Sequence, residues 1–153
     1  MKTNNQLGRS MIEILGVLAI IGVLSVGGIA GYSNAMRKQR LNNLRNQVSH
    51  IVAGVKQFYA AQGNFNDLTT EVAIKAGIIP SDMVIGDAIS ENKSPVKHIY
   101  NGDIWVEFNP NSEMPEFVVI IDYLPKDAVM DIGTANWSDD SDLVEIEIIN
   151  QDE

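Results

Sequence analysis

The sequence predicts an α+β fold, in which a long N-terminal α-helix packs on a small C-terminal antiparallel β-sheet head. Three observations lead to this prediction. Residues 11–31 form an apolar run of 21 residues, an amphipathic pattern follows with no intervening proline, and three short runs rich in β-branched and aromatic residues lie after residue 103. We expect the helix to have a transmembrane half, residues 9–31, and an amphipathic half, residues 32–62.

The apolar run is long enough to cross a bilayer, because about 20 helical residues span the hydrocarbon core. Its only charged residue is Glu13. A carboxylate in such a segment costs a few kcal/mol near the centre and less near an end, so it requires a compensating partner. Within the chain, Arg9 lies one helical turn earlier and is one candidate for an ion pair with Glu13.

The second half of the helix is predicted by apolar residues at spacings of three and four. Gly63 and Asn64 are expected to end it, since both tolerate the left-handed conformation of a helix C-cap. Basic residues at positions 37, 38 and 40 are interpreted as a solvated face at the membrane surface. The apolar stripe consists of Leu41, Leu44, Val48, Ile51, Val55 and Phe58.

Residues 63–153 are expected to form the globular head. A short helix is predicted after Thr69–Glu71, with threonine as its N-cap, and residues 81–102 are predicted to be mostly loop. A short helical turn is expected within residues 126–137. The strands are predicted at 104–108, 117–123 and 143–149, and the head core is expected to include Trp105, Phe108, Phe117, Tyr123 and Trp137.

The composition argues against several functional classes. Residues 1–60 carry a net charge of +6 and residues 61–153 a net charge of −15, so the acidic head is not expected to bind nucleic acid. The chain has no cysteine, and we find no catalytic constellation, metal-ligand spacing or cofactor motif. His50 and His98 are expected to be exposed or hydrogen-bonded, and residues 139–142 to form a solvated turn rather than a calcium site.

The first eight residues are interpreted as a leader peptide. A general secretory signal is cut after its apolar region, and small residues between Ser25 and Ala30 leave that alternative open. The stretch from Leu7 to Gly22, LGRSMIEILGVLAIIG, instead closely resembles the processing signature of type IV pilins. The resemblance implies cleavage by a prepilin peptidase between Gly8 and Arg9, which makes Glu13 the fifth residue of the mature chain.

The resemblance also implies how the protein works. The methylated N-terminal amine of one subunit would meet Glu13 of its neighbour in a helical homopolymer. Membrane lipid would surround the helix of the precursor in the inner membrane, and an assembly ATPase and a platform protein would move it into an extracellular pilus. The order of motifs in the head, including Gly77–Pro80, is similar to the thin-pilus and conjugative-pilus branch of the family.

Two departures from the family pattern affect these expectations. The branch has a disulfide near position 129, where this chain has Val129, so we expect the segment before the last predicted strand to be held by packing alone. Many type IV pilins also have a proline midway along the membrane segment, and this chain has none. Gly27 and Gly31 are small residues at a spacing typical of close helix packing, although glycine is also simply tolerated in membrane helices.

Two alternatives remain open from the sequence. One is a pseudopilin of a type II secretion or DNA-uptake machine, and the other is a signal-anchored envelope protein that binds a ligand without polymerising. The sequence does not distinguish adhesion, conjugation and motility, or a major from a minor subunit.

Overall fold

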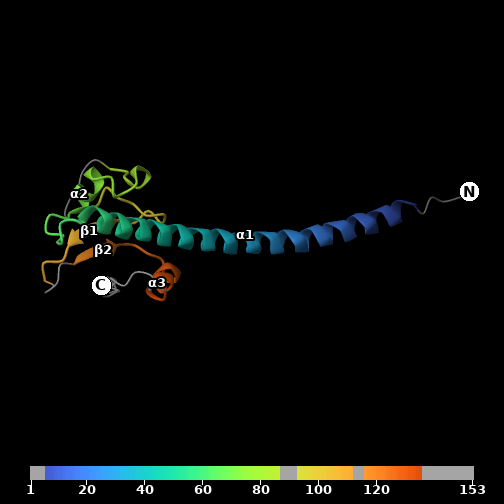
Figure 1. Cartoon of the computed structure of the whole chain (residues 1–153). Helices are drawn as coiled ribbons and strands as arrows, with labels where there is room; N and C mark the ends of the chain where they lie inside the picture. Colours follow the sequence, from blue (N-terminus) through green and yellow to red (C-terminus); the bar gives the residue numbers. More distant parts are fainter. Residues whose placement is uncertain (1–5, 87–92, 112–115, 136–153) are drawn as a thin grey trace, which may run out of the picture. The chain divides into compact units, whose positions relative to one another are not determined.

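The computed structural model describes residues 6–86, 93–111 and 116–135. A long helix followed by a small antiparallel sheet confirms the predicted α+β class. The chain divides into two compact units, one up to Gln39 and one from Arg40 onward. The elements are α1 (Gln6–Tyr59), α2 (Thr70–Lys75), the 3-10 helix η1 (Ser81–Met83), β1 (Ile104–Phe108), β2 (Phe117–Ile121) and α3 (Lys126–Gly133) (Figure 1).

The C-terminal part of α1 supplies one wall of the head core. The predicted apolar stripe is confirmed except at its two ends. Leu41 is only half-buried, and at the other end Tyr59 is 3% exposed whereas Phe58 is 46% exposed. Tyr59 is buried because its ring packs on Phe65, with centroids 5.5 Å apart, and Phe65 packs in turn on Phe117 at 5.0 Å. The buried residues of this stretch are Leu44, Val48, Ile51, Val55 and Tyr59.

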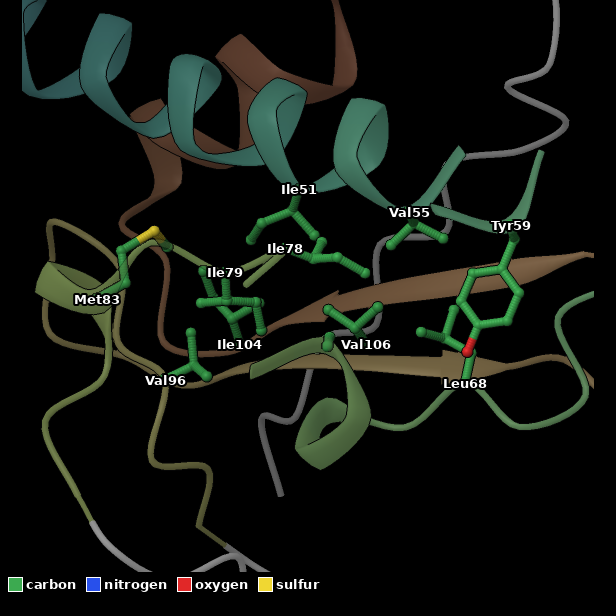
Figure 2. Close-up of a cluster of buried hydrophobic side chains, with 11 residues drawn as sticks. Ile51, Val55, Tyr59, Leu68, Ile78, Ile79, Met83, Val96, Ile104 and Val106 are labelled. Atoms are coloured by element: carbon green, nitrogen blue, oxygen red, sulfur yellow. The ribbon is translucent and has the colours of Figure 1, made fainter. Parts of the chain in front are cut away.

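The core lies between α1 and β1 (Figure 2). Ile51 and Val55 point from the helix toward Ile104 and Val106 of the strand, and all four side chains are fully buried. The segments between α1 and β1 in the sequence close the remaining sides of this cluster, through Leu68, Ala73, Ile78, Ile79, Met83 and Val96.

β1 is hydrogen-bonded along both of its edges. On one side it pairs antiparallel with β2, from Ile104 opposite Ile121 to Phe108 opposite Phe117. On the other side the hydroxyl of Thr70 accepts from the backbone N–H of Val106 at 2.9 Å and donates to its carbonyl at 3.3 Å. This strand is therefore the centre of the head, and the loop before it contributes the isolated bridges Val84 to Val96 and Lys97 to Asp103.

Local signals in the sequence account for the helix ends. The side chain of Thr69 caps α2 by accepting from the N–H of Val72 at 3.2 Å, as predicted. Gly63 has a φ of +68°, the left-handed conformation expected there, but α1 itself ends at Tyr59 and the intervening residues form a turn.

The end of β2 differs from the prediction. The strand stops at Ile121. The N–H of Asp122 still donates to Asp103 at 3.0 Å, but Tyr123 then takes a left-handed φ of +54°, which ends the extended backbone. Tyr123 is consequently 83% exposed, so its predicted place in the core is wrong. Trp105 is half-buried, and Phe108 and Phe117 pack on the core. Trp137, the turn at 139–142 and the strand predicted at 143–149 lie outside the described residues.

The helical turn predicted within residues 126–137 is α3. An ion pair links it to α1, which corrects the expectation that packing alone holds this segment. Arg45 Nε lies 2.7 Å from Asp131 Oδ2, and Arg45 Nη2 donates to Asp131 Oδ1 at 2.8 Å and to its backbone carbonyl at 3.3 Å. One charge-assisted hydrogen bond, from Nη2 to Oδ1, therefore joins the two side chains, while Nε and Oδ2 are close without forming a second hydrogen bond.

Gly54 should be required for the packing of α1 in the head. An ideal Cβ at this position would lie 2.9 Å from Ile78 Cγ2. This methyl group sits on a branched Cβ, so it can move only if χ1 leaves its preferred rotamer or the backbone shifts. Gly54→Ala adds about 1 kcal/mol of helix propensity, but overpacking costs about 1–3 kcal/mol. We expect a net loss and a lower melting temperature of the full chain in detergent micelles. Gly27→Ala, whose Cβ would meet no atom within 4 Å, is the matched control and should leave head unfolding unchanged. Equal effects of the two substitutions would contradict this account.

Arg45→Met and Asp131→Asn test the link between α1 and α3. The arginine side chain is 41% exposed, so we expect a coupling energy of only about 1 kcal/mol in a double-mutant cycle of chemical unfolding. Each single change should also speed proteolysis at α3. Arg40→Met, at an exposed arginine of the same helix, should change neither quantity. A coupling energy of zero would mean that packing holds α3 after all.

Candidate functional site

The first half of α1 carries an extended apolar surface. Each of its large apolar side chains is between 51% and 75% exposed in the single chain. We call this the N-terminal apolar surface, and its members are Met11, Ile12, Ile14, Leu15, Val17, Leu18, Ile20, Ile21, Val23, Leu24, Val26 and Ile29.

This surface runs around the whole helix rather than along one face. Successive residues of an α-helix are rotated by about 100°, so neighbouring apolar positions such as 11–12, 14–15 and 20–21 point in different directions. A helix that is apolar all round is normally buried in a membrane or in a larger core. Among the described residues, α1 is the one helix long and apolar enough to cross a membrane by length and composition.

Two polar side chains interrupt this surface in different ways. The hydroxyl of Ser25 donates to the carbonyl of Ile21, one turn earlier, at 2.7 Å, so it is already hydrogen-bonded within the helix. Glu13 is exposed. Once lipid or protein covers the surrounding side chains, this carboxylate loses water and needs a cationic or hydrogen-bonding partner.

The glycines of this region have no role in the packing of the single chain. An ideal Cβ at Gly27 or Gly31 would meet no atom within 4 Å, whereas at Gly54 and Gly102 it would collide with neighbouring residues. The two N-terminal glycines lie four residues apart, hence on one face of α1. Their use in packing between helices stays a prediction.

The structure places all five predicted site residues on one element. Gly8 and Arg9 lie near the start of α1. Glu13, Gly27 and Gly31 belong to the same helix and to the stretch that carries the N-terminal apolar surface. Cleavage after Gly8 and a partner for Glu13 both stay predictions.

The head supplies a second polar arrangement that sequence reasoning missed. His98 is buried and contacts the end of β2, 24 residues away in the sequence. Only the glycine at position 102 hinted at a close approach, and a single glycine in a turn is not specific. In the part of the chain that the structure describes, no group of three or more histidines and carboxylates is placed to hold a metal ion.

Comparison with known proteins gives one family match. The family model described as Bundlin matches residues 33–117, which is 85 of the 153 residues. No curated protein and no solved structure matches the chain. The matched range covers the second half of α1 and most of the described head, and it begins after the apolar run.

Proposed function

The chain belongs to the bundlin family, a pilin-like family, and from this premise we propose that it is the structural subunit of a type IV pilus. The observation that carries the proposal is the N-terminal apolar surface, because a single chain leaves it uncovered on every side of the helix. In this role the protein assembles and does not catalyse.

Two separate parts of the sequence support the proposal. The family match starts at residue 33, whereas the processing signature lies between Leu7 and Gly22. The signature was therefore not counted in the match, and each observation favours a pilin independently of the other. The assignment to the branch of thin-pilus and conjugative-pilus subunits rests on the order of head motifs alone.

The need to cover the apolar surface accounts for the two states of a pilin, the membrane precursor and the filament subunit. Lipid surrounds residues 9–31 of the precursor in the inner membrane. In the filament, the same side chains contact the helices of neighbouring copies instead. Gly27 and Gly31 would allow two helix backbones to approach closely at one point, because no side chain stands between them.

Glu13 would set the register between copies. Cleavage after Gly8 creates a new amine at Arg9, and this amine of one subunit would neutralise Glu13 of the next. A buried carboxylate without a partner is strongly disfavoured, so an incoming subunit is most stable at the one stagger that provides a cation. Arg9 of the same chain remains the competing partner, one helical turn away.

The proposal implies further components that act on this chain. A prepilin peptidase would remove residues 1–8 and methylate the new terminus, and an assembly ATPase with a membrane platform protein would extract the subunit. The mature protein would then be at the cell surface. A pseudopilin would use the same helix in a short periplasmic fibre, and long surface filaments seen by electron microscopy would distinguish a pilin from it.

The mature N-terminus tests processing directly. We expect Edman or mass-spectrometric sequencing of the protein from membranes to begin at Arg9. A terminus near Ala30 would identify a cleaved secretory signal, and an intact Met1 would identify an uncleaved anchor. In either case Arg9 would not be the N-terminal residue, so the free amine at Arg9 that the assembly mechanism requires would be absent.

Glu13→Gln tests the role of the carboxylate with almost no change in size. We expect at least a tenfold loss of filaments, measured by shearing and electron microscopy, with normal amounts of subunit in the membrane. Glu107→Gln removes an exposed carboxylate of β1 and should leave assembly intact. Normal filaments from Glu13→Gln would show that contacts other than this carboxylate set the register. A wild-type chain that forms no filaments at all would instead support the envelope-protein alternative.

A further inference from the structure

His98 occupies a buried position in the head where both of its ring nitrogens are used. The residue is 4% exposed. Its Nε2 lies 2.8 Å from the backbone carbonyl oxygen of Asp122, and its Nδ1 accepts from the backbone N–H of Tyr100 at 3.1 Å. A carbonyl only accepts and a backbone N–H only donates. These partners therefore fix the neutral ring with its proton on Nε2.

The surroundings leave no room for a rearranged ring. An ideal Cβ at Gly102 would overlap both the His98 ring and the Asp122 carbonyl. Hydrogen bonds also hold the backbone around the ring. The N–H of His98 donates to the carbonyl of Gly102 at 3.1 Å, and the N–H of Asn101 donates to the carbonyl of His98 at 2.8 Å. A water molecule therefore has little space in which to replace a broken hydrogen bond.

His98 joins three elements of the head. Through Asp122 it reaches the end of β2, where Tyr123 is held in a left-handed conformation. The neighbouring N–H of Ile99 donates to Oε1 of Gln47 on α1 at 3.1 Å. The turn of residues 98–102 also leads directly into β1. We call this turn with Asp122 the His98 corner.

The charges around the ring come from the loop and from the end of β2. Lys97 and Asp103 form an ion pair beside the ring, Asp122 contributes its carboxylate, and α1 contributes the neutral Gln47. Burial lowers the pKa of His98 below its ordinary value, and this effect exceeds the opposing influence of the Asp122 carbonyl and the Asp103 carboxylate.

We propose that His98 is an acid-sensitive latch, which holds the His98 corner together only while Nδ1 is unprotonated. A second ring proton would face the N–H of Tyr100, so that hydrogen bond would be lost. The two opposed N–H groups would push the ring out of the narrow space beside Gly102, and its Nε2 contact with Asp122 at the end of β2 would be lost with it. Tyr123 would then be free to leave its left-handed conformation, which is sparsely populated by residues other than glycine.

The sign of the pH dependence follows from the lowered pKa. The unfolded state takes up the proton first as the pH falls, near the ordinary value of about 6.5. The latch therefore contributes its full stability above that pH and loses it progressively below. Histidine is the side chain whose ordinary pKa lies between pH 5 and pH 8, so an interval from about pH 7.5 to about pH 5.5 reports mainly on histidine.

The chain offers a clean test because it has only two histidines and His50 is exposed on α1. The full chain in detergent micelles is unfolded thermally at the two pH values, as wild type, His98→Gln and His50→Gln. We expect the melting temperature to fall by several degrees on acidification in wild type and His50→Gln, and to change far less in His98→Gln. An equal fall in all three proteins would overturn the proposal.

A second measurement does not require the variant to fold. Nitrogen-15 NMR of the unmodified chain reports the tautomer and titration of each ring, and His50→Gln assigns the remaining signals. We expect the Nε2-protonated tautomer for His98 and a titration below the ordinary histidine value of about 6.5. We also expect the amide of Tyr100 to be less protected in acid, when its exchange rate is compared with the intrinsic rate at the same pH. Titration of His98 at or above about 6.5, or unchanged protection of the Tyr100 amide, would contradict the latch.

Discussion

One constraint governs this protein, which is that α1 presents an apolar surface that the single chain leaves exposed. Burying one such side chain fully is worth about 1.5–3 kcal/mol. Twelve side chains, each more than half exposed, therefore offer on the order of 10–20 kcal/mol for being covered. A carboxylate in the same region costs only a few kcal/mol. Apolar burial thus favours covering the surface. In the proposed filament, Glu13 would select among the possible arrangements, because an unpaired charge disfavours most of them.

The second half of α1 is packed differently from the first half. From Leu44 to Tyr59, one face of α1 is buried against β1 and the segments around it, so this half of the helix has its partners within the protein. The glycines show the contrast. Gly54 and Gly102 lie where a side chain would collide with Ile78 or His98, whereas Gly27 and Gly31 face open space. Only contacts with another molecule would require the second pair to be glycine.

The sequence alone was sufficient to predict those parts of the fold and of the candidate site that depend on local interactions. The helix periodicity, the Thr69 cap and the strand at 104–108 are patterns within a few residues, and so are the apolar run and Glu13 of the candidate site. The sequence was insufficient where distant residues decide. Tyr59 replaces Phe58 in the core because of aromatic partners beyond the helix end. Tyr123 is exposed because its left-handed conformation turns the chain away from the strand directly after Asp122, whose carbonyl contacts His98. The two residues of the Arg45–Asp131 pair are 86 positions apart, so no local sequence pattern predicts their contact.

The absence of cysteine makes contacts between copies directly measurable. Single cysteines at Leu18 and Ile21, with Asp82→Cys in the head as an exposed reference, are introduced and isolated filaments are treated with a short thiol crosslinker and with a water-soluble maleimide. If helices of neighbouring copies cover α1, the two helix positions should resist the maleimide and yield covalent oligomers, while the reference reacts with it freely. Helix positions that label as readily as the reference and yield only monomers would show that assembly leaves this surface uncovered.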